Sequence, residues 1–293
     1  MSQTRDRIAQ WLLRANARLP LAFNHALGIL IGTAFTWLPN KRVATARTNI
    51  RRCFPEMSKR EQRKLLHSAM RHAGRAIVEA GRMWARPPAD NIALLRSIEG
   101  EEVIRQAREQ QRGVILATPH LGNWELAGSY VSSRYPLTIM YRPSRMAGLD
   151  DMIHGGRESS GGKYVPADGS GVRAQLKALK AGELIGILPD QVPTEGGIIV
   201  PFFGLPALSM TLLSNLARKT NAVVIFSVVE RLPWARGYRM TFLPSDEAIT
   251  TADMEESVER VNAQVEKCIQ LCPEQYLWTY KRFKNATPGF YIK

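Results

Sequence analysis

The stretch Val114-Ile-Leu-Ala-Thr-Pro-His120-Leu-Gly-Asn-Trp-Glu125 joins a short apolar run to a turn that carries a histidine and a carboxylate. Residues 114–118 are rich in aliphatic side chains and follow Gly113, which predicts a buried strand of a parallel sheet. Pro119 then ends the strand. Ligands of open α/β sheets bind beyond the carboxyl ends of strands, so His120 is predicted to stand where such folds keep their reactive groups.

The five-residue spacing between His120 and Glu125 constrains the turn. On a continuous helix these residues would be rotated by about 500°, roughly 140° from a shared face, so they cannot meet on one regular helix. Leu121 and Gly122 are therefore predicted to form an irregular turn, with a helix that begins near the N-cap residue Asn123. Glu125 could then reach back and hold one imidazole nitrogen as a donor, which leaves the other as a base. The alternative is structural: His120 caps the strand and Glu125 satisfies helix N–H groups.

Positive charge is concentrated at one end of the chain. The 293 residues are 45% hydrophobic and carry a formal net charge of +14, but residues 1–90 alone hold 17 Lys and Arg against 5 Asp and Glu. The length allows one sizeable α/β core with a small helical appendage. Nucleic acid and acidic lipids are both anionic partners that this positive charge could attract. The neighbouring apolar stretch favours a membrane surface, so we expect no nucleic acid partner. The cysteines are too few for a disulfide framework, and Cys268 and Cys272 suit helix packing better than a metal site.

The first 40 residues are predicted to be a membrane-associated segment. Residues 3–18 can form a basic amphipathic helix on a membrane surface. Residues 19–38 follow without a formal charge, and such a length could cross about 30 Å of hydrocarbon. The alternative is a buried core helix. We interpret this segment as an anchor that spans or dips into the bilayer and leaves the catalytic domain on the cytoplasmic side.

The rest of the chain predicts a helical region followed by an α/β domain. A capping box, Ser58-Lys-Arg-Glu61, opens a long basic helix that Pro87-Pro88 ends. The predicted regions are an anchor at 1–40, a basic helical region at 41–90 and an α/β domain at 91–293, in which a mixed, largely parallel sheet is flanked by helices. Helices are predicted at 101–111, 123–134, 149–157, 171–181, 210–220 and 253–272, and strands at 114–118, 137–141, 184–188, 222–229 and 236–243.

Three further polar residues are candidates for the same edge of the sheet. Arg142 follows strand 137–141 and Asp190 follows strand 184–188, so both stand at the carboxyl ends of strands. A guanidinium group suits phosphate because its planar fork donates two parallel hydrogen bonds. Arg157, which follows Gly155 and Gly156, is a weaker candidate for binding a phosphate group. Both arginines could equally be solvated surface residues.

An apolar loop after Asp190, Gly196-Gly-Ile-Ile-Val-Pro-Phe-Phe-Gly204, is a candidate for an apolar ligand groove. Val200, Phe202 and Phe203 could line it, although aromatic residues in such a run also suit a core. Because Phe202 and Phe203 are adjacent on an extended segment, only one is expected to face the groove. The sequence has no glycine-rich phosphate-binding loop and no GxSxG nucleophile motif, and no cofactor or metal is expected.

Four motifs, in order along nearly the whole chain, resemble a known family. A histidine followed by an acidic residue resembles the first motif of the glycerolipid and lysophospholipid acyltransferases. The complete string from His120 to Glu125 is similar to that of the late acyltransferases of lipid A synthesis, of the lauroyl- and myristoyltransferase type. The other similar segments are Tyr141-Arg-Pro143, residues 196–207 and Trp278-Thr-Tyr-Lys-Arg-Phe-Lys284, in which Tyr280 replaces the usual histidine.

The resemblance implies a glycerolipid acyltransferase-like fold and an O-acyltransferase at the bacterial inner membrane. Such an enzyme moves a secondary fatty acyl chain from acyl carrier protein to a hydroxyl of a lipid A precursor. His120 would remove the hydroxyl proton, Glu125 would hold the imidazole, and the alkoxide would attack the thioester directly, without a covalent acyl-enzyme. The residues expected to bind substrate are Asn123, Arg142, Arg157, Asp190, Phe202 and Phe203.

The expected partners are acyl carrier protein, the lipid A precursor and anionic membrane lipids. All three are acidic, so the basic residues between 41 and 86 would attract them. Two other functions stay open. A glycerol-3-phosphate or lysophosphatidate acyltransferase would share the histidine and acid motif. A non-enzymatic basic protein that binds membranes or nucleic acid would explain the charge but not His120 at the end of a strand.

Overall fold

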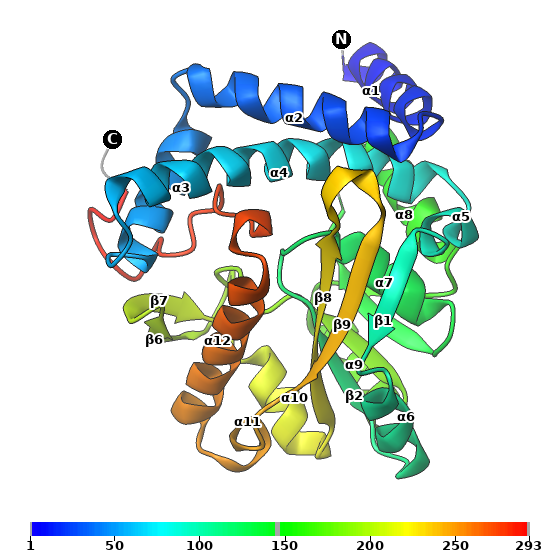
Figure 1. Cartoon of the computed structure of the whole chain (residues 1–293). Coiled ribbons are helices and arrows are strands. Elements are labelled where there is room, and N and C mark those ends of the chain that lie inside the picture. Colours follow the sequence, from blue (N-terminus) through cyan, green and yellow to red (C-terminus); the bar gives the residue numbers. More distant parts are fainter. Residues whose placement is uncertain (1, 144–146, 292–293) are drawn as a thin grey trace.

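The computed structural model describes residues 2–143 and 147–291, which are built around a seven-stranded sheet (Figure 1). The strands are β1 (Leu95–Glu99), β2 (Val114–Ala117), β3 (Leu137–Tyr141), β4 (Lys163–Pro166), β5 (Leu184–Ile187), β6 (Ile198–Phe202), β7 (Leu205–Ser209), β8 (Val223–Arg231) and β9 (Tyr238–Pro244). The sheet order is β1-β9-β8-β2-β5-β3-β4, and the β8–β9 pair is antiparallel while the other neighbours are parallel. The strands β6 and β7 form a separate antiparallel hairpin.

Helices cover both faces of the sheet and one of its ends. The longer helices are α1 (Ser2–Ala17), α2 (Leu21–Trp37), α3 (Lys41–Cys53), α4 (Lys59–Ala85), α6 (Glu102–Glu109), α7 (Trp124–Ser132), α8 (Ala147–Glu158), α9 (Gly169–Lys180), α10 (Leu212–Thr220) and α12 (Met254–Leu271). The shorter ones are α5 (Pro88–Ile92) and α11 (Ala248–Thr251). The helices α2 and α4 lie across the end of the sheet where β8 turns into β9, which is also the end where β2 finishes (Figure 1).

Alternation along β2 divides the core into two parts. Ile115 and Ala117 pack with residues of α9, α10 and α12 on one face of the sheet. Val114 and Leu116 pack with residues of α6 and α7 on the other. All four side chains are buried, because helices cover both faces of a central parallel strand and leave it no polar position.

The predicted alternation of helices and strands from residue 101 onward is confirmed, with boundaries shifted by a few residues. The elements that were not predicted are the short helices α5 and α11, the hairpin β6–β7, and the strands β1 and β4. Both strands lie at the edges of the sheet and stay partly exposed, so neither carries the continuous apolar run of a central strand. The hairpin contains two prolines, Pro201 and Pro206, which obscure a strand pattern.

The helix α2 is joined to α4 by close and buried contacts. A Cβ atom at Gly74 of α4 would lie 2.1 Å from the carbonyl oxygen of Gly28 of α2, so only glycine allows the two backbones to approach this closely. Nearby, Nε2 of His25 lies 2.7 Å from a carboxylate oxygen of Glu79, and both side chains are buried. The capping box predicted at Ser58 and Glu61 opens α4.

Residues 19–38 do not form one long spanning helix. Within the described residues, no single helix is long and apolar enough to cross a membrane, and α2 reaches that length and composition only together with α3, across a bend of 87°. The predicted spanning segment is therefore not supported, because Pro20 and Leu38 bound α2 at 17 residues.

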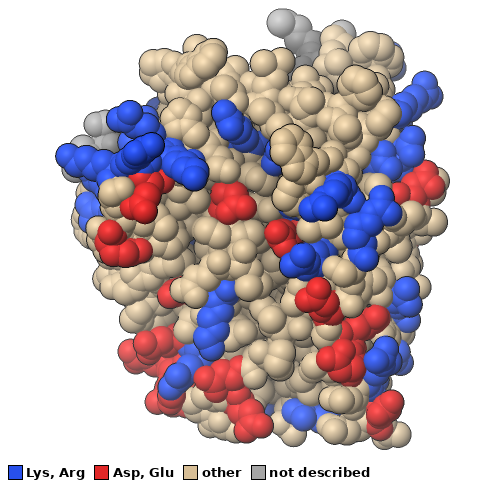
Figure 2. Space-filling view, in the orientation of Figure 1, with Lys and Arg blue, Asp and Glu red and all other residues tan. Residues whose placement is uncertain are grey.

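The outward side of α1 and α2 is nevertheless apolar. Trp11, Leu30 and Trp37 are 67%, 67% and 78% exposed. Figure 2 shows this end of the molecule as a mostly uncharged surface, with Lys and Arg side chains gathered in a band beneath it. A contiguous exposed apolar surface of this kind marks an interaction site. We call it the apolar face of α1 and α2, and it comprises Ile8, Trp11, Leu12, Phe23, Leu27, Leu30 and Trp37.

Candidate active site

His120 lies at the carboxyl end of β2 and contacts an aspartate from the end of the neighbouring strand β5. Its Nδ1 is 2.8 Å from Oδ1 of Asp190, and its backbone N–H donates to Oδ2 of the same carboxylate over 3.1 Å. Because β2 and β5 are adjacent and parallel, their loops meet although they are far apart in sequence. The predicted position of His120 is confirmed, and Asp190 is its partner.

Asp190 determines which nitrogen of His120 can act as a base. Burial by itself would raise the pKa of Asp190, but the imidazole of His120 and the hydrogen bonds that its ring and backbone donate hold the pKa below its ordinary value. An ionised Asp190 accepts the proton on Nδ1, so the lone pair of the neutral ring lies on Nε2. The amide nitrogen of Gln191, 3.1 Å away, donates to that lone pair. Nε2 is thus the nitrogen that could act as a base toward a molecule that displaces Gln191.

Backbone hydrogen bonds fix the loop after His120 from two sides. The N–H of Leu277 donates to the His120 carbonyl over 3.0 Å, and the N–H of Asn123 donates to Val229 of β8 over 2.8 Å. Between them Gly122 has a φ of 60°, and a Cβ there would lie 1.9 Å from the Val229 carbonyl oxygen. Only glycine fits, so the loop is rigid and presents the imidazole in one place.

Asn123 caps α7, as predicted, and also reaches a buried charge. Its side-chain oxygen accepts from the N–H of Leu126, and its amide nitrogen donates to Glu79 over 3.2 Å. Glu79 also binds Nε of Arg231 at 2.8 Å. Burial alone would raise the pKa of Glu79, but Arg231 and His25 hold it below its ordinary value. Sequence reasoning missed this cluster, and the available signal was that Glu79 is one of only two acidic residues in the basic helix α4.

Glu125 does not hold the imidazole, so the predicted pairing with His120 is corrected. Its carboxylate binds Arg157 of α8 through two hydrogen bonds of 2.5 and 3.0 Å and accepts a third, of 3.2 Å, from the indole N–H of Trp84. The physical reason is geometric: the loop that Gly122 turns directs Glu125 toward α4 and α8, while Asp190 already occupies the histidine's Nδ1. Glu125 instead fixes a partly buried arginine beside the histidine loop.

The two candidate arginines occupy different surroundings. Arg142 is exposed at the end of β3, two strands from β2 and hence about 10 Å across the sheet. Its guanidinium donates to the hydroxyl of Thr194 in the loop after Asp190. Arg157 is mostly buried and pairs with Glu125, which raises its pKa against the lowering effect of burial. Of the two, Arg142 has its charge available to a phosphate at this edge.

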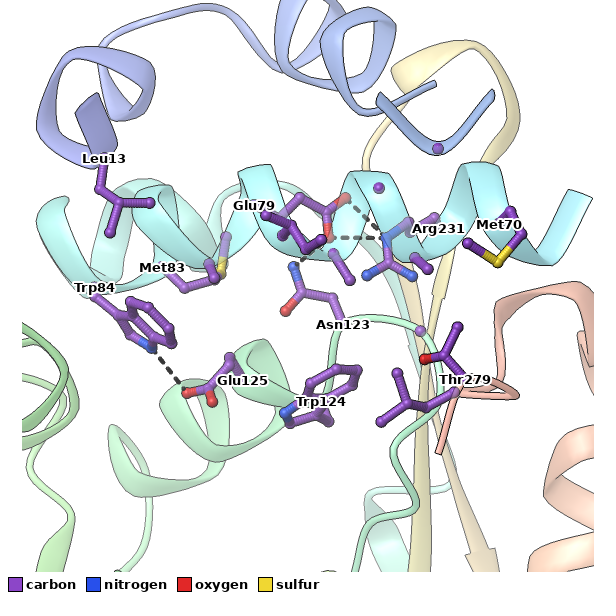
Figure 3. A pocket seen from close by; sticks show the side chains of 18 of the residues that line it. Leu13, Met70, Glu79, Met83, Trp84, Asn123, Trp124, Glu125, Arg231 and Thr279 are labelled. Carbon is purple, nitrogen blue, oxygen red and sulfur yellow. Dashed lines mark hydrogen bonds and ion pairs between the residues drawn. The ribbon is translucent and has the colours of Figure 1, made fainter. Parts of the chain in front are cut away.

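An apolar cavity of about 450 Å³ adjoins the histidine loop (Figure 3). Its walls come from α1, α2 and α4 on one side and from residues 122–125 and 277–279 on the other. The lining of α4 runs from Met70 to Trp84, a distance of about 21 Å along the helix axis. His120 itself is not a lining residue, but Gly122, Trp124 and Leu277 are. The cavity therefore starts beside the loop that carries His120 and is long enough for an extended hydrocarbon chain.

Phe202 and Phe203 are not part of this cavity, which corrects the predicted groove. Val200 and Phe202 are at most 2% exposed, and Phe202 packs in the core under the guanidinium of Arg282. Phe203 stacks edge-on against Phe54 and packs on the same core. The turn between β6 and β7 directs these side chains inward, so the core alternative for this segment is the correct one.

The chain matches the family model described as bacterial lipid A biosynthesis acyltransferase over residues 6–285. It is 31% identical over 281 residues to the lipid A biosynthesis lauroyltransferase of Escherichia coli K12, covering 95% of this chain and 90% of that protein. It is 30% identical to the palmitoleoyltransferase of the same organism over 93% of this chain and 88% of that protein. The chain is 24% identical to the lipid A biosynthesis myristoyltransferase of E. coli K12, over 82% of this chain and 75% of that protein.

These matches include the histidine loop, the strand end that carries Asp190 and the helix α4 that lines the cavity. The family model covers residues 6–285, and two relatives are at least 30% identical over more than 90% of this chain. The chain belongs to the bacterial lipid A biosynthesis acyltransferase family.

Proposed function

We propose that this protein transfers a fatty acyl chain from the thioester of an acyl carrier protein to a hydroxyl group of a lipid A precursor. The observation that carries the proposal is the His120–Asp190 pair at the sheet edge, with Nε2 in contact with the neutral amide of Gln191 and an apolar cavity beside the loop. A base next to a hydrocarbon site is what acyl transfer to a lipid hydroxyl requires. The family membership supports the lipid class of the acceptor.

In the proposed reaction, Nε2 of His120 takes the proton from the acceptor hydroxyl as its oxygen attacks the thioester carbonyl. Asp190 stabilises the imidazolium that forms. When the tetrahedral intermediate collapses, the carbon–sulfur bond breaks and the imidazolium returns its proton to the leaving thiolate. No acyl-enzyme is needed. In line with this, burial raises the pKa of the Cys268 thiol to about 12, which makes it a poor nucleophile.

The test is an assay with purified protein, an acyl-acyl carrier protein and a lipid A precursor that lacks secondary acyl chains. We expect a product heavier by one acyl chain in mass spectrometry. Glycerol 3-phosphate and lysophosphatidate serve as competing acceptors in parallel reactions. Preferential acylation of either competitor would replace the proposed acceptor, and absence of transfer to all three would refute acyl transfer.

The α4 wall of the cavity is expected to select the length of the donor chain. Ala73 lines it, and leucine at that position would occupy space that the terminal carbons of the chain need. Each buried CH₂ contributes about 0.8 kcal/mol, so Ala73→Leu should shift the preference between donors that differ by two carbons roughly tenfold toward the shorter one. Competition between two acyl carrier protein donors measures the shift.

The matched control for this prediction is Phe202→Leu, which changes a large buried side chain outside the cavity. It should lower the melting temperature and leave the chain-length profile unchanged. If Phe202→Leu alters the chain-length preference and Ala73→Leu does not, the acyl chain binds at the hairpin β6–β7 and not in this cavity.

We further propose that the apolar face of α1 and α2 rests on the cytoplasmic leaflet of the bacterial inner membrane. The exposed indoles of Trp11 and Trp37 suit the level of the headgroups, and the basic band beneath the face suits anionic lipids (Figure 2). The same basic surface would attract an acidic carrier protein. This arrangement needs no spanning helix.

Replacing Trp11, Leu30 and Trp37 together by serine should weaken binding to vesicles that contain anionic lipid by about tenfold or more, because the apolar area that enters the interface is lost. Vesicle sedimentation measures the binding. The control is Ile199→Ser, which removes an exposed apolar side chain on the hairpin β6–β7. Equal binding of the triple variant and the control would contradict the proposed membrane face.

A further inference from the structure

Arg231 is a buried arginine whose hydrogen bonds use only part of its guanidinium group. It ends β8, its side chain is 2% exposed, and it lines the apolar cavity. Nε donates to both oxygens of Glu79 at 2.8 Å. Within the described part of the chain, the two terminal nitrogens make no hydrogen bond, and Figure 3 shows them directed away from Glu79 toward the space above Trp124 and Thr279.

The carboxylates and the amide that line the inner part of this cavity already have partners. Glu79 accepts from Arg231 and Asn123 and pairs with His25. Asn123 uses its oxygen for the cap of α7, and Glu125 is held by Arg157 and Trp84. The planar edge of Arg231, with several N–H donors, is thus a charged group that an occupant of the inner cavity can reach, beside the neutral indole of Trp124 and the hydroxyl of Thr279.

The charge of Arg231 indicates which oxygen this edge would bind. Glu79 neutralises the guanidinium at contact distance and is fully engaged, so a second carboxylate would leave the Arg231–Glu79 pair with a net negative charge in a mostly apolar site. A neutral carbonyl or hydroxyl oxygen can accept from the edge without adding charge. The buried donors would otherwise remain unpaired, which is unfavourable.

We propose that Arg231 hydrogen-bonds a neutral oxygen on the lipid chain that occupies the cavity, and so selects chains with an ester, amide or hydroxyl oxygen over plain hydrocarbon. The inference rests on the proposed lipid acyl transfer for the nature of the occupant. Arg231 is in this sense a specificity residue: it recognises an oxygen along the chain, while the apolar wall of α4 recognises the hydrocarbon.

The experiment compares three probes with the same number of carbons, an n-alkane, a fatty acid methyl ester and a fatty acid, titrated into the full chain by calorimetry below the critical micelle concentration of one detergent. A hydrogen bond to a charged donor should make the ester bind roughly ten- to hundredfold more tightly than the alkane. The ester should also bind at least as tightly as the carboxylate. These affinities are measured on the unmodified protein. Equal affinity for ester and alkane, or clearly tighter binding of the carboxylate than of the ester, would overturn the proposal.

Variants assign the preference to the residue. Arg231→Lys keeps a cation beside Glu79 but removes the planar edge, so the ratio of ester to alkane affinity should fall toward one while the alkane affinity stays the same. Arg42→Lys, at an exposed arginine that lines the same cavity, is the matched control and should keep the ratio. A ratio that survives Arg231→Lys, or that falls equally in Arg42→Lys, refutes the assignment.

These measurements fail or succeed independently of the proposed reaction, because they involve no turnover. A His120 variant that has lost acyl transfer should bind the three probes with unchanged ratios. If acyl transfer is absent in all assays but the ester preference is present and depends on Arg231, the binding inference stands and the proposed reaction falls.

Discussion

Replacement of His120 by alanine is expected to lower the rate of acyl transfer by at least about 10²–10⁴-fold, the range that general base catalysis contributes. The imidazole is the group at the sheet edge whose Nε2 faces no acidic partner, and its loop is fixed by Leu277 and by Val229 of β8. The loss should appear in kcat more than in KM, since the base acts in the transition state. The measurement is steady-state transfer from an acyl carrier protein donor.

Loss of activity by unfolding must be separated from loss of the base. Removal of the imidazole leaves one oxygen of the buried Asp190 without its partner, which costs about 1–3 kcal/mol of stability. His120→Asn retains a side-chain donor for Asp190 and removes the base, so it should be folded and as inactive as the alanine variant. Substantial transfer by either folded variant would exclude His120 as the base.

Replacement of Asp190 by asparagine is expected to reduce transfer by about 10²–10⁴-fold with little change in geometry. The amide can donate to Nδ1, which would favour the tautomer that carries its proton on Nε2 and has no base facing the substrate. The variant should therefore bind substrates normally and fail in the chemical step. Transfer kinetics, with lipid binding measured separately, test this.

Glu125→Gln is the comparison that distinguishes the two acidic residues near the histidine. It weakens the contact with Arg157 and leaves the His120–Asp190 pair intact, so its effect on kcat should be clearly smaller than that of Asp190→Asn. The opposite order, with Glu125→Gln the more damaging, would show that Glu125 orients the imidazole during catalysis.

The parts of the site that sequence reasoning predicted correctly are local. Val114–Ala117 is a strand because of its own apolar run, and Asn123 starts a helix because of its own side chain. The partner of His120 is not local, since Asp190 lies 70 residues away and meets the histidine only because β5 is adjacent to β2 in the sheet. Strand order is a property of the whole chain, and the nearer carboxylate of Glu125 was the natural but incorrect choice.

The unexpected burial of Phe202 in the core has a similar physical cause. A run such as the one that contains Phe202 and Phe203 has the same composition whether it lines a cavity or fills a core, because both surroundings are apolar. The distinction depends on what packs against it, and here Phe54 and Arg282 from distant segments close it off. The face of α4 that lines the apolar cavity contains small residues such as Ala73 and Ala80, which leave space unfilled.

The position of α4 between α2 and the histidine loop has a consequence for how a lipid reaches the site. The cavity is walled by Leu13 of α1 and Phe35 of α2 as well as by the loop at Trp124. If the outer side of α1 and α2 rests on a leaflet, a hydrocarbon tail can slide from the bilayer into the protein without crossing water. The barrier avoided is about 0.8 kcal/mol for each CH₂ that would otherwise be hydrated, so lateral extraction would keep turnover from being limited by lipid desorption.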